Sequence, residues 1–511
     1  MNSFHKEGSI SKGCGSSFIT LIPKVDNPSS LKEYRPISLI GCINKIISKV
    51  LACRIKSFMG SLISETQSAF LAIRNIIDGA LIVNETLTWL KKARKKAFFF
   101  KIDFDKAFDS VSWEFIDTVL ELMNFPCKWR VWIRGILSST KASVLLNGSP
   151  TKEFQCYRGL RQGDPLSPFL FILMMEAFSC VMNKACNEGV LKGIQIPNNG
   201  PYISHLLFAD DAIIMGEWSS TNLANLRRIM RSFYLVSGLK MNTMKCNLFA
   251  INVPEDTTNV MAGALQCQVG VFPFSYLGLV IGENMNLIKN WRSVIEIFER
   301  RLSLWKAKQL SFGGRITLIK SVLNSLPVYY FSLYKAPVGV LDRLERIRKA
   351  FFWGGSGDRN KIHWVAWDNV TVKKEMGGLG LSTLREINLG LLAKWWWRYK
   401  ISPESLWCRV VNGLHNVSKA GDVIPCRNGL TGVWKNISKI DTSFHGLGIN
   451  LKCLIQGVVG RGNVISFWSD TWIGHIPLCF RFPKLFKLEL NKSCKVGDHL
   501  IKDGELTRAK E

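Results

Sequence analysis

Two adjacent carboxylates, those of Asp210 and Asp211, interrupt an otherwise apolar run, SHLLFADDAIIMG, at 204–216. Burying two ionised carboxylates side by side costs free energy unless another charge compensates them. A divalent cation can do so, because a hard ion such as Mg²⁺ takes oxygen ligands and keeps open positions for water and phosphate oxygens. The pair is therefore a candidate metal site, although an isolated Asp-Asp pair most often marks only a turn.

A site for two metal ions needs a third acid, and Asp103 is the candidate. The segment KAFFFKIDFD at 96–105 alternates as a strand, with one face formed by Phe98, Phe100, Ile102 and Phe104. Asp103 lies on the other face, with Phe99, Lys101 and Asp105. Successive strand residues point to opposite faces, so Asp210 and Asp211 can reach one site only from the tip of a hairpin. The alternative for Asp103 is a solvated strand end paired with Lys101.

The elements around these acids follow from periodicity and capping residues. FITLIPKV at 18–25 is expected as a strand, 38–63 as a helix, and 202–217 as two short strands with the acidic pair between them. Ser112 is expected to cap a helix, WEFIDTVLELM, with Glu114 in its first turn. Ser167 is expected to cap another helix, with Pro168 in its first turn.

The second half of the chain has the spacing of amphipathic helices at 291–307, 314–326 and 338–353. Beyond 356 the pattern is irregular and rich in glycine, with 391–399 as its one strong helical piece. The tryptophans at 395–397 are expected in the core rather than as platforms for base stacking. Cys479, Cys494 and His499 are close in sequence, but their spacing matches no recognised metal site.

Composition indicates a multidomain protein with a polyanionic partner. The 511 residues carry 67 Lys and Arg against 39 Asp and Glu, a formal net charge of +28, which suits nucleic acid or an acidic membrane surface. The longest apolar stretch, at 169–182, is short for a membrane span and contains Glu176, and the N-terminus has no apolar signal core. Fourteen cysteines without a CxxC pair are typical of reduced thiols. We expect a nuclear or cytoplasmic protein that is neither secreted nor membrane-bound.

A series of motifs in fixed order resembles the reverse transcriptases of non-LTR retrotransposons, specifically those of the long interspersed element type found in plants. The motifs are FITLIPK with YRPISLIGCINKIISKVLACRIK, QSAF, KIDFDKAFDSVSWEF, GLRQGDPLSPFLFIL, FADD, GLKMNTMKC and YLG. The resemblance implies an α/β (α+β) right-hand polymerase fold. Fingers and a palm sheet would occupy 1–287, a helical thumb 288–355, and a mostly helical C-terminal extension of unknown role 356–511.

The resemblance implies that Asp103, Asp210 and Asp211 bind two Mg²⁺ ions, or Mn²⁺ in their place, together with the backbone carbonyl of Phe104. Lys245 matches a lysine proposed to protonate the leaving pyrophosphate, with a plain surface lysine as the alternative. Such a site neutralises charge in phosphoryl transfer, which asks little covalent work of the protein.

Nucleotide-binding roles are implied for a further set, namely Lys24, Arg35, Phe108, Gln162 and Gly163. Lys24 and Arg35 match residues that hold the triphosphate, with solvated surface charge as the alternative. Phe108 matches an aromatic gate against the nucleotide sugar, with a core phenylalanine as the alternative. Gln162 and Gly163 match a loop that lines the nucleotide and template pocket, although the glycine could serve only a turn.

The thumb and the primer-binding hairpin are also implied. Tyr276, Leu277 and Gly278 match a hairpin that grips the primer, or else they are ordinary core residues. Arg343, Arg346 and Arg348 are expected to contact the phosphate backbone of a bound duplex if they lie on a thumb helix. They occupy positions 0, 3 and 5 along that helix and do not share one face perfectly, so the expectation rests mainly on Arg343 and Arg346.

The implied function is that of an RNA-directed DNA polymerase, whose partners are an RNA template, a DNA primer and deoxynucleoside triphosphates. The alternative is a catalytically silent remnant that at most binds nucleic acid nonspecifically. Ile73 stands where glycine is expected, and Ala212 where threonine is common. Relatives carry an endonuclease domain upstream and often a cysteine/histidine segment downstream. Neither is visible, so the chain is expected to be a fragment.

Overall fold

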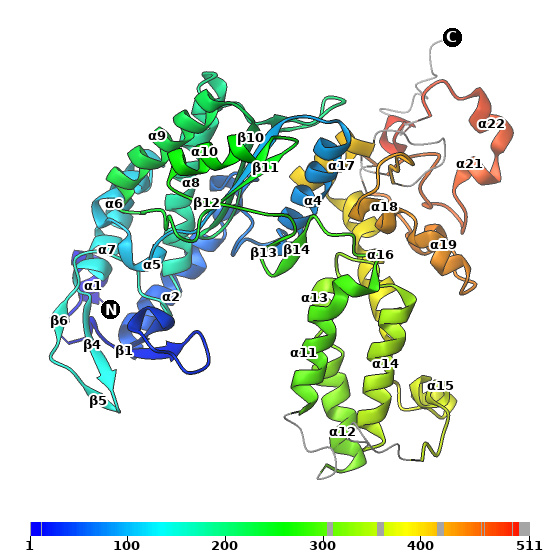
Figure 1. Cartoon of the computed structure of the whole chain (residues 1–511), viewed down its shortest axis with the longest axis horizontal. Coiled ribbons are helices and arrows are strands. Elements are labelled where there is room, and N and C mark those ends of the chain that lie inside the picture. Colours follow the sequence, from blue (N-terminus) through cyan, green and yellow to red (C-terminus); the bar gives the residue numbers. More distant parts are fainter. Residues whose placement is uncertain are drawn as a thin grey trace. The chain divides into compact units, whose positions relative to one another are not determined.

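The computed structural model describes residues 2–11, 13–303, 310–354, 362–415, 424–460, 462–463, 465–492 and 494–499. The chain divides into two compact units (Figure 1). Unit 1 comprises Met1–Gly79, Ala93–Gln195 and Tyr202–Val271, and unit 2 comprises Ala80–Lys92, Ile196–Pro201 and Phe272–Glu511. Helix α4 (Ile76–Lys92) has residues in both. The division into fingers with palm, thumb and extension stays a prediction.

The centre of unit 1 is a five-stranded sheet with the strand order β12-β11-β3-β10-β9. Its strands are β3 (Ala97–Ile102), β9 (His205–Phe208), β10 (Asp211–Glu217), β11 (Asn247–Ile251) and β12 (Gln268–Val269). Strand β3 pairs antiparallel with both β10 and β11. The predicted strand at 96–105 is thus confirmed in its first part and ends at Ile102. Phe98, Phe99 and Phe100 have no exposed surface, so the face that carries Asp103 is polar only near the end of the strand.

One core joins this sheet to helices α6 (Trp113–Leu122), α8 (Ser167–Asn187) and α9 (Ser220–Ser237). The predicted cap of α6 is confirmed, because the Ser112 hydroxyl accepts a hydrogen bond from the Phe115 N–H at 3.3 Å. The predicted cap of α8 is wrong. Ser167 is itself the first helical residue, and the carboxylate of Asp164 accepts from the Leu166 N–H at 2.7 Å. The buried loop turns Asp164 back onto the helix start, which the local sequence does not reveal.

Helix α8 is longer than the apolar stretch at 169–182 that the sequence analysis judged too short for a membrane span. It has 21 residues, and by length and composition alone it is long and apolar enough to cross a membrane. In this structure its apolar side chains belong to the core of unit 1, where Phe171 and Phe178 have no exposed surface. Its one acid, Glu176, accepts from the N–H and the hydroxyl of Ser64 at 3.0 and 2.9 Å.

A second sheet of unit 1 has the order β2-β1-β4-β5, with β6 paired to β4. Its strands are β1 (Ser16–Pro23), β2 (Tyr34–Ile40), β4 (Lys141–Leu146), β5 (Ser149–Pro150) and β6 (Phe154–Gln155). The strand predicted at 18–25 is confirmed. The helix predicted at 38–63 is wrong at its start, because β2 continues to Ile40 and helix α2 (Cys42–Lys56) follows it. The apolar residues Leu39 and Ile40 satisfy the strand and helix patterns alike.

The remaining elements of unit 1 are short. They are α1 (Asn2–Glu7), α3 (Met59–Leu62), α5 (Ala107–Ser110), α7 (Cys127–Ser138), α10 (Glu255–Leu265), β7 (Ile194–Gln195), β8 (Tyr202–Ile203) and a 3₁₀ turn at Leu31–Glu33.

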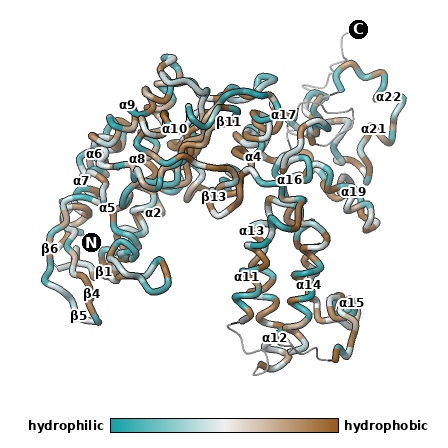
Figure 2. The backbone as a smooth tube through the Cα atoms, in the orientation of Figure 1, coloured by the Kyte–Doolittle hydropathy of each residue, from teal (hydrophilic) through white to brown (hydrophobic). Residues whose placement is uncertain are grey.

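Unit 2 begins with a hairpin of β13 (Phe274–Tyr276) and β14 (Leu279–Ile281) and continues as helices. These are α11 (Arg292–Ser303), α12 (Phe312–Leu318), α13 (Val328–Phe331), α14 (Val338–Phe352), α15 (Trp367–Thr371) and α16 (Leu384–Ile401), with 3₁₀ turns at Ile288–Trp291 and Lys374–Met376. In Figure 2, α11 and α14 alternate between hydrophilic and hydrophobic residues, as amphipathic helices do. The three predicted helices are confirmed, except that 304–307 lies outside the described residues and that Ile319–Leu323 forms a π-helical turn.

The C-terminal part of unit 2 contains further helices, in agreement with the helical extension that the resemblance implies. It contains α17 (Leu406–His415), α18 (Val433–Ser438), α19 (Ile440–His445), α20 (Leu451–Leu454), α21 (Leu478–Arg481), α22 (Pro483–Leu488) and a 3₁₀ turn at Val496–His499. The expectation of one strong helical piece beyond 356 is therefore wrong. Trp395 and Trp396 are buried as predicted, but Trp397 is 49% exposed. Consecutive helical residues turn by about 100° each, so three in a row cannot all face one core.

Candidate active site

The hairpin of β9 and β10 carries the acidic pair. Phe208 of β9 pairs with Asp211 of β10, which leaves Ala209 and Asp210 as a two-residue turn. Ala209 has a φ of 53°, a left-handed conformation of the kind that tight hairpin turns require. The hairpin predicted from the sequence is confirmed, with Asp210 in the turn and Asp211 at the start of β10.

Gln67, which the sequence analysis missed, holds this turn. Its side-chain oxygen accepts hydrogen bonds from the N–H groups of Ala209 and Ala69, each at 3.0 Å. Gln67 has no exposed surface. The motif QSAF is visible in the sequence, but only the fold shows that its glutamine reaches a turn 142 residues away.

The pairing of β3 with β10 brings the third acid to the same place. Ile102 is opposite Ala212 in the antiparallel register, so the next positions, Asp103 and Asp211, are neighbours at the end of the two strands. Phe104 follows directly and is buried, and it forms a bridge with Met241. The structure thus brings Asp103, Asp210 and Asp211 together at one end of the central sheet.

The surroundings of Asp210 and Asp211 disfavour the charged form of both carboxylates. Burial raises the pKa of Asp210 although the residue keeps contact with solvent, and Asp103 raises it further, whereas Arg35 lowers it. Burial also raises the pKa of Asp211, and Asp210 and Asp103 add to the rise, whereas Lys101 lowers it. A bound divalent cation would reverse these shifts. A donor set made of carboxylate oxygens fits Mg²⁺ or Mn²⁺.

Lys245 lies beside this group, with its Nζ atom 3.8 Å from Oδ1 of Asp103. The loop that carries Lys245 is anchored to Asp103 by two residues that the sequence analysis missed. The Asn242 N–H donates to the Asp103 carbonyl at 2.8 Å, and the Asp103 N–H donates to the sulfur of Cys246 at 3.4 Å. Burial raises the pKa of the Cys246 thiol to about 11, so this sulfur stays protonated at neutral pH.

Two basic residues lie on the second sheet of unit 1. Arg35, on β2, is exposed and close enough to Asp210 to lower the pKa of that carboxyl. Lys24, just after β1, is also exposed, and its Nζ donates to the carbonyl of Lys32 at 2.9 Å. Arg35 is therefore placed near the acids. Lys24 lies near Asp109 of α5, because its charge offsets part of the rise that burial causes in the pKa of that carboxyl.

The loop of Gln162 and Gly163 packs against β2. The Ser38 N–H donates to the Gln162 carbonyl at 2.8 Å. Gly163 has a φ of 111°, and a Cβ atom there would lie 3.0 Å from the carbonyl oxygen of Ser38. The glycine is needed for this backbone conformation and for its close approach to β2.

Phe108 lies in helix α5, which begins five residues after Ile102, the last residue of β3. The chain has therefore already left the strand at this position, as the sequence indicated. Phe108 is half-buried, and its ring stacks on that of Phe171 with 4.6 Å between centroids. One part of the ring is packed and the other is accessible.

The comparison with known families agrees with this geometry. A family model described as reverse transcriptase (RNA-dependent DNA polymerase) matches residues 22–281, just over half of the chain. The chain belongs to the reverse transcriptase family. Its mixed helix-and-sheet architecture is the right-hand polymerase fold, and the matched residues include the three acids of the central sheet.

Relatives of this reverse transcriptase chain occur in plants and animals. A putative ribonuclease H protein of Arabidopsis thaliana is 35% identical over 191 residues, which cover 36% of this chain and 29% of that protein. A Pol polyprotein from the type-2 retrotransposable element R2DM of Drosophila melanogaster is 29% identical over 377 residues, 71% of this chain and 34% of that protein. The chain spans about a third of the length of these relatives. A solved telomerase of Candida albicans aligns with a TM-score of 0.36 and 12% identity, over 81% of this chain and 66% of that one.

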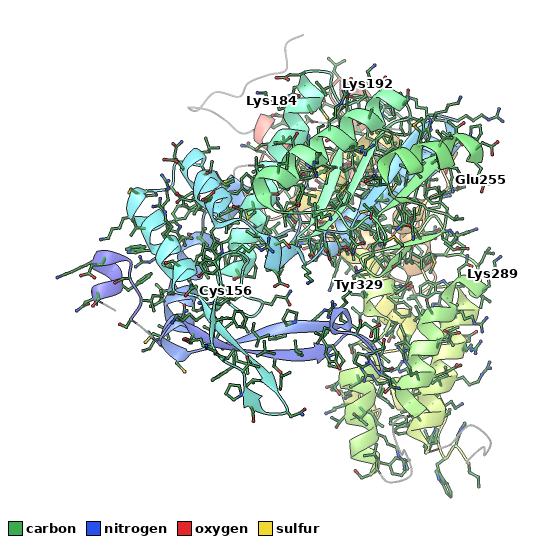
Figure 3. All side chains as sticks on the ribbon, turned by 60° about the vertical axis from the view of Figure 1, so that its left-hand side comes forward. Cys156, Lys184, Lys192, Glu255, Lys289 and Tyr329 are labelled. Carbon is green, nitrogen blue, oxygen red and sulfur yellow. The ribbon has the colours of Figure 1, made fainter. Side chains whose placement is uncertain are left out.

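In unit 2 of this reverse transcriptase chain, Tyr276, Leu277 and Gly278 belong to a tight hairpin. Tyr276 pairs with Leu279, and the two turn residues, Leu277 and Gly278, have φ values of 50° and 78°. The hydroxyl of Tyr329, labelled in Figure 3, donates to the Leu277 carbonyl at 2.6 Å. Burial raises the pKa of Tyr329 to about 12, so the hydroxyl remains a donor. The hairpin is rigidly held, and its grip on a primer stays a prediction.

The three arginines expected on a duplex-binding face of α14 do not share one environment. Arg343 and Arg346 are exposed, and Arg343 pairs with Glu299 at 3.0 Å. Arg348 has no exposed surface and pairs with Glu345 at 2.7 Å, while it also donates to the Ser382 carbonyl at 3.1 Å. The expectation that Arg348 contacts a duplex is therefore wrong, because its position on the helix faces the core of unit 2.

Proposed function

We propose that this chain is the RNA-directed DNA polymerase of a plant non-LTR retrotransposon of the long interspersed element type. It would extend a DNA primer on an RNA template by transferring nucleotides from deoxynucleoside triphosphates to the primer 3′-hydroxyl. The observation that carries the proposal is the convergence of Asp103, Asp210 and Asp211 at one end of the central sheet of a reverse transcriptase domain. Phosphoryl transfer needs positioning and charge neutralisation more than covalent participation by the protein.

The acids of the central sheet are the proposed metal ligands. The carboxylates of Asp103, Asp210 and Asp211, with the Phe104 carbonyl, would hold two Mg²⁺ ions, or Mn²⁺. When bound, these ions would lower the pKa of the primer 3′-hydroxyl and neutralise the leaving pyrophosphate. Lys245, 3.8 Å from Asp103, would hold the proton that the pyrophosphate takes as it leaves.

Residues around the acids would orient the incoming nucleotide. Arg35 acts electrostatically on Asp210, which supports a role in binding the triphosphate, and Lys24 would assist it. Gln162 and Gly163 would line the nucleotide and template pocket through the loop that packs on β2. The accessible part of the Phe108 ring would lie against the deoxyribose and leave no room for a 2′-hydroxyl.

The origin and setting of the chain are also part of the proposal. The relative in Arabidopsis thaliana supports a plant source, and the relative from the element R2DM supports a retrotransposon. The chain would be the polymerase portion of a longer element protein, which agrees with the third of each relative's length that it spans. The net charge of +28 supports nucleic-acid partners, and we propose a nuclear or cytoplasmic location.

One observation favours the alternative, a catalytically silent remnant that at most binds nucleic acid. Ile73 stands where glycine is expected, and it has a φ of 73°, a strained conformation for a β-branched residue. A chain under weakened selection could tolerate such strain. The intact acids favour the active enzyme.

Primer extension on a homopolymer RNA template with Mg²⁺ distinguishes these two functions. The polymerase should extend the primer, and chelation of the divalent ion should stop it. Asp210→Asn should abolish extension but leave duplex binding nearly unchanged, because acids hold metal whereas basic residues hold the phosphate backbone. Asp256→Asn, which changes an exposed acid on α10, is the matched control and should extend normally. Full extension by Asp210→Asn would contradict the metal assignment, and no extension by the parent chain would favour the silent remnant.

A further inference from the structure

Three residues of the C-terminal part of unit 2 bring different metal-binding groups together. A carboxylate oxygen of Glu489, the sulfur of Cys494 and an imidazole nitrogen of His499 all lie within 4.8 Å of one another. Glu489 directly follows α22, Cys494 lies in the next loop, and His499 ends the 3₁₀ turn Val496–His499. None of them belongs to the reverse transcriptase match at 22–281.

A pair of aromatic residues, Phe467 and Trp468, holds all three in place. The indole N–H of Trp468 donates to Glu489 at 3.2 Å. The Phe467 N–H donates to the Cys494 carbonyl at 2.9 Å, and the Phe467 ring lies 4.5 Å from the His499 ring, measured between centroids. Residues that orient ligands in this way are a regular part of protein metal sites.

The core around this group is small. Among the described residues it consists of Trp468, Leu478, Cys479 and Cys494, with Phe467, Trp472 and Phe486 packed against it. A core of this size contributes little stability by itself, and small folds often add a bound metal or disulfides. Both cysteines of the cluster are unoxidised. A metal ion bound by these three side chains would link the end of α22, Cys494 and the 3₁₀ turn Val496–His499.

We propose that Glu489, Cys494 and His499 form a binding site for Zn²⁺. Carboxylate, thiolate and imidazole are the ligand types that zinc takes in proteins, and a thiolate ligand disfavours Mg²⁺. Tetrahedral zinc bonds of about 2.0–2.3 Å place ligand atoms roughly 3.5 Å apart, so these three atoms need to close by only about 1 Å. His499 is exposed, which leaves an entry path and a fourth position for water. Cys479, which the sequence places near the other two, is not one of the three.

Cobalt binding to the full-length chain tests the site directly, because Co²⁺ bound by a thiolate has a charge-transfer absorption that Co²⁺ bound by oxygen lacks. The acids of the central sheet therefore do not contribute to this band. The parent chain should show the band with one equivalent of Co²⁺, and Zn²⁺ should remove it. Cys494→Ser should lose the band, whereas Cys479→Ser, which changes a buried cysteine of the same cluster, should keep it. An equal band in Cys494→Ser and the parent would overturn the proposal.

A second variant, at an exposed position, tests the site without the risk that the substitution unfolds the cluster. His499→Gln changes an exposed side chain, so the metal-free protein should keep the circular dichroism spectrum of the parent. Its affinity for Zn²⁺, measured by competition with a chromogenic chelator, should fall by more than about tenfold, since even outer partners of a metal site contribute 10–100-fold. An unchanged affinity in His499→Gln would overturn the proposal. Primer extension plays no part in either test, so the outcome is independent of the polymerase activity.

Discussion

The Nζ atom of Lys245 lies 3.8 Å from Oδ1 of Asp103, at the edge of the three acids of the central sheet. Both side chains keep contact with solvent, so the pair adds little to the stability of the fold. The contact instead fixes the position of the Lys245 side chain. It places an ammonium group next to the carboxylate where, under the proposed function, the pyrophosphate leaves.

Lys245→Met should lower the rate constant of nucleotide addition by about 10²–10⁴-fold, the usual contribution of a positioned proton donor. The apparent affinity for nucleotide should change much less. Single-turnover primer extension over a range of nucleotide concentrations measures both. Lys240→Met, which changes an exposed lysine of the same loop, is the control. Equal losses in the two variants would assign the effect to the loop instead.

Without divalent ions, the stability of the protein should fall as the pH rises through the raised pKa values of Asp210 and Asp211. The folded state binds these protons more tightly than the unfolded chain, so the stabilisation is full at acid pH and is lost on deprotonation. Asp210→Asn removes one of the negative charges that repel one another. Metal-free Asp210→Asn should therefore unfold at a higher temperature than the parent at neutral pH and at the same temperature at acid pH. Addition of Mg²⁺ should stabilise the parent more than the variant. A variant less stable than the metal-free parent at neutral pH would argue against the repulsion.

Phe108→Val should raise the incorporation of ribonucleotides relative to deoxyribonucleotides by about tenfold or more, because a smaller side chain leaves room for the 2′-hydroxyl. Each nucleotide type is tested separately on one primed template. Phe171→Leu removes the ring on which Phe108 stacks and controls for the loss of packing alone. If Phe108→Val loses both activities equally, or unfolds, Phe108 is a core residue and not a gate.

Substitution of Arg346 should change the salt dependence of duplex binding, whereas substitution of Arg348 should change the stability of the fold. Arg346→Gln, at an exposed position, should reduce the slope of log affinity against log salt by about 1 if α14 contacts a duplex. Arg348→Met should leave that slope unchanged but cost about 3–5 kcal/mol of unfolding free energy, because it removes the guanidinium that balances the charge of the half-buried Glu345 and leaves that carboxylate with the N–H donors of Trp367 and Leu384. Salt titrations of template-primer binding and urea unfolding measure the two effects. A flatter slope in Arg348→Met, at unchanged stability, would reverse the assignment.

Ile73→Gly should stabilise the protein by about 1 kcal/mol. A left-handed conformation costs an L-residue roughly 1–2 kcal/mol, and the greater freedom of glycine in the unfolded chain offsets part of the gain. The side chain of Ile73 is 84% exposed, so its removal loses little packing. The neighbouring Arg74 donates to the carbonyls of Ile63 and Gln67 at 2.8 and 2.6 Å and fixes the backbone beside it. Urea unfolding checks the prediction, and a destabilised variant would mean that Ile73 contributes packing that outweighs its strain.

Local signals in the sequence were enough for much of the fold. The apolar run before Asp103, the two short strands around the acidic pair, the Ser112 cap and the amphipathic helices of unit 2 were all predicted, because periodicity and capping depend on neighbours along the chain. The order of the motifs also indicated the reverse transcriptase family and its three acids. These features need no knowledge of which strands pair.

Only the tertiary structure decided which side chains meet across long separations in sequence. Gln67 reaches the turn of Ala209, and Lys245 reaches Asp103, because strand register and loop paths bring them together. Arg348 and Trp397 were assigned to the wrong environments, since helical spacing defines a face but not what covers it. Glu489, Cys494 and His499 each contact Phe467 or Trp468, which lie more than 20 residues earlier in the chain, and no short-range pattern encodes a contact of that kind.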